Sequence, residues 1–355
     1  MMANQALGAP RLPGPQPVIN KEVAVPAKAD SSLLANAGNS QFADRVFSFA
    51  MLCCALCVLS LVGLIIYELA GKSSLSWHAS GLKFFWRSDW DPVNEQFGAL
   101  PFIFGTVLSS ILALLLAVPL AVGVAVFITE MCPRKLRGAL AFTTELLAAI
   151  PSVIYGVWAM FVLVPFLRED VEPWLAHYFG WTSNFTHRFG FQGPFEGQPF
   201  GIGMLAAAII LAIMVVPIVS SITREVMTAV PQQQREAVLA LGATRWEMIR
   251  TGVLRNARAG IFGGVILGLG RALGETMAVT MVIGNTPQIA ASLFAPGYTM
   301  ASVIANEFNE APGDTYRSAL IEIGLALFFV TIIVNILAQL LVWTVTRGTP
   351  ARANG

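Results

Sequence analysis

The sequence predicts an all-α polytopic membrane protein with six transmembrane helices, and two observations carry this prediction. The chain of 355 residues is 55% hydrophobic and only 12% charged, whereas a soluble domain carries about 25% charged residues. Apolar runs also recur along the chain at the length that a spanning helix needs, roughly 20 residues. The net charge of +1 gives no reason to expect a nucleic-acid partner, whereas membrane lipid is an expected one.

The chain divides into a tail and a membrane domain. Residues 1–42 are expected to form a disordered cytoplasmic tail, because residues 1–40 are rich in Pro, Ala, Gly, Asn and Gln and contain no aromatic residue. Residues 43–346 are expected to form the transmembrane domain. Its six predicted spans cover about 46–67, 99–129, 138–167, 200–223, 259–284 and 318–346. Prolines within these spans are tolerable where neighbouring groups satisfy the carbonyls that they free.

The distribution of basic residues predicts the orientation. If the N-terminus is inside, the cytoplasmic segments hold most of the 22 Lys and Arg residues. Cytoplasmic loops are enriched in these residues, so both termini are expected in the cytoplasm. Two external stretches, 77–91 and 173–181, are rich in aromatic residues. Short helices on the outer interface are expected there, and contact with an external partner is the alternative.

One basic residue, Arg271, remains within a predicted span, and Glu275 follows it in "GLGRALGETMAV" (268–279). A charge at the bilayer centre costs roughly 2.5–3.5 kcal/mol on insertion scales. An ion pair one helical turn apart returns only about 0.2–0.5 kcal/mol. Both side chains are therefore expected to face protein or water rather than lipid.

Two interpretations of Arg271 and Glu275 remain open. The pair could be a buried ion pair that fixes the register of the helix. Alternatively, Arg271 lines the path of an anion, because a guanidinium group fits two phosphate oxygens at once. Glu275 would then accept a hydrogen bond from the P–O–H group that phosphate retains near neutral pH and sulfate lacks. We favour the second interpretation.

The same predicted span carries small residues at regular spacing. Gly260, Gly264 and Gly268 recur every four residues, and small residues at that period let another helix approach closely. The helix is therefore expected to pack within a bundle, against the corresponding helix of a second membrane subunit of the same kind.

Residues 224–258, which we call the elbow, form the one sizeable cytoplasmic loop between spans. Pro231 can start a helix that Gly242 ends, and Thr244 then begins a second helix with Glu247 at capping-box spacing. Such a helix–glycine–helix unit is predicted to be a docking element for a partly acidic surface. The alternative is a basic loop that folds on itself.

Within the elbow, "REAVLALGATRWEMIRTGVLR" (235–255) resembles the EAA loop of bacterial ABC importer permeases. Glu236, Ala237 and Gly242 match that motif at its spacing. The sequence departs from the motif at three positions. The motif has Ala, Ile and Pro where this sequence has Val238, Gly252 and Arg255. The resemblance implies that Glu236, Ala237 and Gly242 couple the chain to an ATPase subunit.

Four further segments together resemble the PstC type of permease subunit in phosphate-specific ABC importers: "FFWRSDWDPVNEQFGALPFIFGT" (84–106), "ELLAAIPSVIYGVW" (145–158), "GLGRALGETMAVTMVIGN" (268–285) and "ANEFNEA" (305–311). The resemblance covers about residues 42–345. It implies a type I ABC importer permease fold and import of inorganic phosphate by alternating access. It also implies a second permease subunit, two ATPase subunits and an external phosphate-binding protein. It supports Arg271 and Glu275 as residues that transport needs.

The chain itself is not expected to be an enzyme. "GKSS" (71–74) lacks the earlier glycine of a phosphate-binding loop, and the three histidines have no ligand spacing. No metal or cofactor is expected on this chain, and ATP and Mg are expected on the partner ATPase. A permease for sulfate, molybdate or phosphonate is the nearest alternative, and a scaffold that signals phosphate supply is another.

Overall fold

The computed structural model describes residues 37–180 and 193–346. The described residues fall into two units, one up to Leu64 and one from Ile65, and each is considered by itself. Their structure consists of helices and loops, with one isolated bridge between Asp91 and Gln96. Most of the predicted tail lies outside the described residues. The last residues of the predicted tail are helical instead of disordered, because a helix begins at Ala37.

The first unit consists of the N-terminal part of α2 (Ala37–Lys72). The second unit contains four more helices of at least 20 residues, which are α4 (Leu100–Val126), α10 (Met204–Thr228), α13 (Arg255–Gly274) and α16 (Asp314–Thr346). Its shorter helices are α3 (Ser74–Ser80), α5 (Arg134–Ala149), α6 (Ser152–Trp158), α7 (Val164–Phe166), α8 (Glu172–Phe179), α11 (Gln232–Ala240), α12 (Arg245–Glu247), α14 (Met277–Val282) and α15 (Met300–Glu307).

Short stretches of other helix types join several of these helices. A 3₁₀ turn, η1 (Gly81–Phe85), follows α3. Wider π-helical stretches are η2 (Phe127–Met131), η3 (Ala159–Leu163), η4 (Leu167–Val171) and η5 (Met248–Leu254). They keep neighbouring helices continuous, so that α6 to α8 form one long rod and α12 runs through η5 into α13.

Among the described residues, five helices are long and apolar enough to cross a membrane: Asp44–Lys72, Leu100–Met131, Ser152–Phe179, Met204–Thr228 and Asp314–Thr344. Four of them correspond to the first, second, fourth and sixth predicted spans, with ends that differ by a few residues. The third predicted span, 138–167, is wrong as one straight helix, because the chain breaks between α5 and α6. Ile150 is extended there (φ −67°, ψ 130°), since the ring of Pro151 disfavours a helical residue before it.

The fifth predicted span, 259–284, is also interrupted. Helix α13 ends at Gly274, and Glu275 is extended (φ −69°, ψ 128°) before α14 begins. Helix α14 has only six residues. Helix α13 has 20 residues, but three arginines and several glycines make it too polar to count among the five apolar helices. The predicted count of six continuous spans therefore becomes five long helices and one broken one in the described residues.

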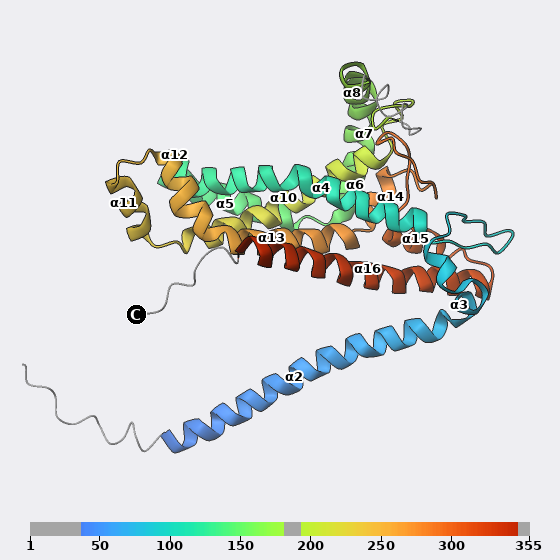
Figure 1. Cartoon of the computed structure of the whole chain (residues 1–355), viewed down its shortest axis with the longest axis horizontal. Helices are drawn as coiled ribbons and strands as arrows, with labels where there is room; N and C mark the ends of the chain where they lie inside the picture. Colours follow the sequence, from blue (N-terminus) through green and yellow to red (C-terminus); the bar gives the residue numbers. More distant parts are fainter. Residues whose placement is uncertain (1–36, 181–192, 347–355) are drawn as a thin grey trace, which may run out of the picture. The chain divides into compact units, whose positions relative to one another are not determined.

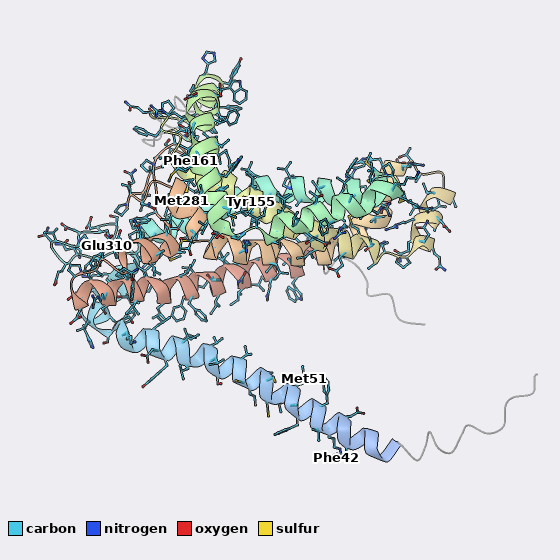
Figure 2. All side chains as sticks on the ribbon, turned by 180° about the vertical axis from the view of Figure 1, so that it is seen from behind. Phe42, Met51, Tyr155, Phe161, Met281 and Glu310 are labelled. Carbon is cyan, nitrogen blue, oxygen red and sulfur yellow. The ribbon has the colours of Figure 1, made fainter. Side chains whose placement is uncertain are left out.

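Helix α10 lies at the centre of the second unit and packs against α4, α13 and α5. Its alanines and branched residues are buried along most of its length. Figure 1 shows α11 and α12 at one end of this bundle and α3 and α15 at the other. The rod from α6 to α8 leaves the bundle at a steep angle, as both views show (Figures 1 and 2). This arrangement puts the two helix breaks at the root of that rod.

Candidate functional site

The break between α13 and α14 separates the two charged residues of the fifth predicted span. Arg271 lies in the last turn of α13, whereas Glu275 lies just beyond its end. Gly274 has nothing within 4 Å of the position that a Cβ would take. The hydroxyl of Thr276 donates to the Gly274 carbonyl at 3.3 Å, which partly satisfies the broken end. The two side chains are therefore not neighbours on one continuous helical face.

Glu275 is buried and turns toward α14. Its side chain is 8% exposed, and its Oε1 accepts a hydrogen bond from the Ala278 N–H at 3.4 Å. A carboxylate in this position satisfies one of the free N–H groups at a helix start. No hydrogen bond of Oε2 is described, so this oxygen can still accept one from a donor.

Arg271, in contrast, is exposed in the isolated chain. Within the described residues, no hydrogen bond or ion pair holds its guanidinium group, and it lies near enough to the Tyr155 hydroxyl for an electrostatic interaction. The buried Arg271–Glu275 ion pair, one of the two open interpretations, is therefore absent from this structure. The guanidinium group keeps all its donors for another partner.

The second break, between α5 and α6, faces the first. The hydroxyl of Tyr155 donates to the Leu147 carbonyl at 2.8 Å, bridging the break. Helix α6 packs directly on α14, where a Cβ at Gly156 would lie 2.6 Å from the sulfur of Met281. Figure 2 shows Tyr155 and Met281 at this crossing. Two interrupted helices thus meet beside Arg271, and interrupted helices build the substrate sites of many transporters.

Glu145, the other acid that the sequence places in this region, does not approach Arg271. It pairs instead with Arg224 on α10. This ion pair joins α5 to α10 near a cavity of about 510 Å³ that is lined by further charged and hydroxyl side chains. No group of three His, Cys, Asp or Glu suited to a metal ion occurs in the part of the chain that the structure describes.

The glycines of α13 face a helix of the same chain. A Cβ at Gly260 would lie 2.5 Å from both methyl groups of Val226, and one at Gly268 would lie 2.8 Å from Val215. Gly264 similarly approaches Ile222. All three neighbours belong to α10. The close approach was predicted correctly, but its expected partner, a second permease, was wrong for these glycines.

The elbow has the structure that its local signals predict. Pro231 precedes α11, and Gly242 follows it with φ +85°. The hydroxyl of Thr244 accepts from the Glu247 N–H while the Glu247 side chain accepts from the Thr244 N–H, so the capping box is formed. These hydrogen bonds from Thr244 lower the pKa of Glu247, because they favour its charged form.

Two departures from the EAA motif compensate for each other. A Cβ at Gly252 would lie 3.3 Å from a methyl group of Val238. The motif has Ile and Ala at these positions, so a larger residue on α11 is matched by a smaller one on η5. Arg235 connects the elbow to other parts of the bundle. It forms an ion pair with Glu130 at 3.2 Å and donates a hydrogen bond to the Met227 carbonyl at 2.7 Å.

The three residues matched to the motif, Glu236, Ala237 and Gly242, are all exposed on the elbow. Sequence reasoning missed two large apolar neighbours, Leu241 and Trp246, which are 89% and 62% exposed. No local pattern distinguished them, because the elbow holds many other apolar residues, such as Val238 and Ile249, that are less exposed. Tyr155 was also missed, and no local pattern pointed to it, because its role depends on where the two breaks meet.

A helical bundle with two interrupted helices and a helix–glycine–helix elbow at one end agrees with the importer-permease fold that the sequence resemblance implies. A solved structure of the MetNI methionine ABC transporter in its inward-facing conformation has the same fold. It matches with a TM-score of 0.50 and 17% sequence identity, over 69% of this chain and 94% of that chain.

Sequence comparisons identify the family. Residues 117–347 match the model of the binding-protein-dependent transport system inner membrane component. The phosphate transport system permease protein PstC of Mesorhizobium japonicum is 44% identical over 87% of this chain and 92% of its own length. That of Pasteurella multocida is 42% identical, over 82% and 89%. A probable PstC of Methanocaldococcus jannaschii is 37% identical, over 71% and 77%. The chain belongs to this family of inner membrane transport components and is a permease of the PstC type.

Proposed function

We propose that this chain is one permease subunit of an ATP-driven importer that moves inorganic phosphate across the inner membrane by alternating access. Its relatives at 42–44% identity are named as phosphate transport permeases. The observation that carries the proposal is Arg271, a permanently charged guanidinium group without a protein partner in the described residues, at the meeting point of two broken helices.

Arg271 binds the phosphate oxygens in this proposal. A guanidinium group presents several N–H donors in a plane and stays charged throughout transport. Lipid does not compensate such a charge, so the group needs an anion or water. A passing oxyanion supplies two acceptors at once.

Glu275 provides the selectivity. Its Oε1 is engaged by α14, whereas no described hydrogen bond involves Oε2. This second oxygen accepts the P–O–H hydrogen of phosphate. Sulfate has no such hydrogen at neutral pH, so the carboxylate only repels it. A site built around a required hydrogen bond discriminates strongly against a ligand that lacks it.

The orientation places both termini and the elbow in the cytoplasm. The elbow holds Arg224, Arg235, Arg245, Arg250, Arg255 and Arg258, and basic residues concentrate on the cytoplasmic side. The third helix, Ser152–Phe179, takes in Arg168, which the sequence assigned to an external loop, so the excess of basic residues in the cytoplasmic segments remains.

The proposed partners are inferred from the elbow, which suits a docking role, and from the ATP hydrolysis that active transport requires. A second permease completes the path, and an external phosphate-binding protein delivers phosphate. Two ATPase subunits hold ATP and Mg, and one of them docks on Glu236, Ala237, Gly242 and the exposed side chains beside them. ATP binding closes the ATPase dimer and moves the elbow, which shifts α13 through its continuous connection with η5 and α12.

Uptake of labelled phosphate tests this function in a strain that lacks the chain. Returning the wild-type chain should restore uptake, whereas Arg271→Ala should reduce it by about 30-fold or more, the loss expected when one partner of a desolvated charge pair is removed. Arg271→Lys keeps the charge without the planar fork and should retain part of the uptake.

Two controls make this test decisive. The Arg271→Ala chain should still co-purify with its partner subunits, and the complex should still hydrolyse ATP. If the variant fails to assemble, Arg271 has a structural role and the path assignment is wrong. If excess sulfate or molybdate suppresses wild-type uptake as well as phosphate does, the substrate assignment is wrong.

A further inference from the structure

The turn η1 and its flanking residues form a pocket far along the chain from Arg271. The pocket has a volume of about 650 Å³ and is lined by Ala79, Ser80, Leu82, Lys83, Trp86 and Arg87. Phe84, in the middle of this segment, is fully buried in the core that α4, α15 and α16 share. A buried anchor between exposed neighbours fixes which way each neighbour points.

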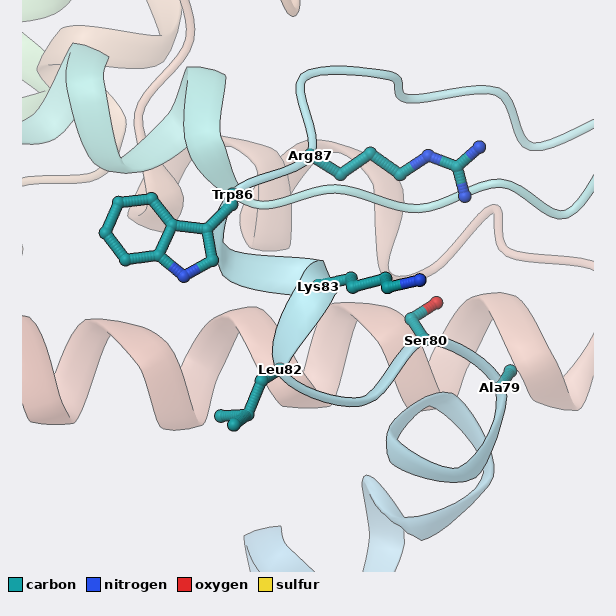
Figure 3. A pocket seen from close by; sticks show the side chains of 6 residues that line it. All are labelled: Ala79, Ser80, Leu82, Lys83, Trp86 and Arg87. Carbon is teal, nitrogen blue, oxygen red and sulfur yellow. The ribbon is translucent and has the colours of Figure 1, made fainter.

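The side chains around this anchor separate by chemistry. Figure 3 shows Lys83 and Arg87 extending to one side, and Trp86 and Leu82 pointing to the other side. Residues four apart share a side in both pairs. Trp86 is 80% exposed and Leu82 is 70% exposed, so none of the described residues covers the apolar side.

The polar side has unused donors. Arg87 uses Nε for Asp89 at 3.4 Å and Nη2 for Gln96 at 2.6 Å. No hydrogen bond or ion pair is described for the Lys83 ammonium group or the Ser80 hydroxyl, and no carboxylate is among the residues that line the pocket. Because Asp89 neutralises Arg87 through an ion pair, the net positive charge of the pocket comes from Lys83. Its ammonium group and the Ser80 hydroxyl suit the oxygens of a phosphate group.

The position of η1 in the sequence indicates its depth in the membrane. It lies between Lys72, where the first long apolar helix ends, and Leu100, where the second begins. Both helices reach the same surface of the membrane there. In the orientation proposed above, that surface is the external one, and η1 lies at the level of the lipid headgroups.

We infer that this pocket binds the headgroup phosphate of an anionic phospholipid in the outer leaflet. Lys83, Ser80 and Arg87 contact the phosphate oxygens, and Leu82 and Trp86 lie against the acyl chains. A free phosphate ion would use the same donors. It would leave two large apolar side chains in water, whereas a lipid covers them, and amphipathic rings such as indole favour this interface.

The test uses the complete transporter in mixed vesicles that contain phosphatidylglycerol or phosphatidylcholine with brominated acyl chains. Bromine quenches nearby tryptophan, and the difference between wild type and Trp86→Phe isolates the contribution of Trp86. Brominated phosphatidylglycerol should quench Trp86 at lower mole fractions than brominated phosphatidylcholine. Lys83→Gln should weaken that preference about fivefold, the effect expected of one basic residue at an anionic surface.

The matched control is Lys72→Gln. Lys72 lies at the same end of the unit and is also exposed, but Glu68 already neutralises it at 3.1 Å, and it does not line the pocket. This variant should keep the lipid preference within twofold, and Ser80→Ala combined with Lys83→Gln should abolish it.

Three results would overturn the inference. One is an unchanged preference in the Ser80→Ala, Lys83→Gln double variant. A second is an equal loss in Lys72→Gln, which would indicate a diffuse surface charge. The third is relief of the quenching by millimolar inorganic phosphate, which would indicate a site for the free ion.

Discussion

At the scale of single residues, the helix break changes what Arg271 and Glu275 are to each other. In a continuous helix they would lie one turn apart and could neutralise each other. Here Glu275 lies beyond the end of α13 and accepts a hydrogen bond from α14, and no carboxylate in the described part of the chain forms an ion pair with Arg271. In the proposed mechanism, Arg271 binds the charge of the anion and Glu275 accepts the hydrogen bond of its P–O–H group.

Glu275→Gln tests the proton argument. The amide removes the negative charge that repels sulfate and weakens the acceptor for the P–O–H group, a charged hydrogen bond of about 1.5–3 kcal/mol. We expect phosphate uptake to fall by roughly tenfold or more, and sulfate to compete better with the remaining uptake. Competition of labelled phosphate uptake by sulfate measures both effects.

Glu145→Gln is the matched control, because Glu145 is also an acid of the membrane domain but pairs with Arg224. It should leave the selectivity between phosphate and sulfate unchanged. Normal uptake and an unaltered selectivity in Glu275→Gln would count against Glu275 as the selective residue.

At the scale of helices, the fit of α13 against α10 depends on one line of glycines. Gly260, Gly264 and Gly268 face valine and isoleucine side chains that are stiff at their first torsion. Gly263 lies on the same helix with nothing within 4 Å of its Cβ position. Two glycines three residues apart thus have opposite surroundings, which makes a controlled comparison possible.

Gly260→Ala should destabilise the transporter by about 1–3 kcal/mol, the usual cost of overpacking. Gly263→Ala should be neutral or stabilise by up to about 1 kcal/mol, because alanine is the better helix former. Thermal unfolding of the purified complex measures both. Similar midpoints for the two variants would show that α13 and α10 do not pack as described.

The elbow and the two helix breaks also show how much of the fold the sequence alone predicts. The elbow was predictable because each of its boundaries has a local signal, namely Pro231, Gly242 and the capping box of Thr244 and Glu247. The break before Pro151 had a signal too, but the long apolar run around it concealed the break. The break at Glu275 has no proline, and the partner of the glycine line depends on tertiary packing. No local pattern could give either.

At the scale of the whole molecule, the exposed apolar residues of the elbow are the proposed docking site of an ATPase subunit. Leu241 and Trp246 lie on either side of Gly242 and face away from the core. Buried apolar anchors supply much of the affinity in protein interfaces. In the proposed assembly these two side chains fill pockets on an ATPase subunit, with Glu236 beside them.

Replacing both Leu241 and Trp246 by serine should therefore release the ATPase. We expect at least a tenfold loss of the ATPase that co-purifies with the chain, together with loss of uptake, while the second permease remains bound. The control is Val93→Ser, since Val93 is 90% exposed but lies far from the elbow in the sequence. Retention of the ATPase by the double variant would exclude these residues as the docking anchors.

The most direct measurement of the central claim is a high-resolution density map of the assembled transporter, determined with phosphate in the states before and after ATP binding. In at least one state, the Arg271 guanidinium group should lie within hydrogen-bond distance, about 2.7–2.9 Å, of a phosphate oxygen inside the path. An Arg271 side chain that points away from the path and is closed off by dry protein in every state would contradict the mechanism.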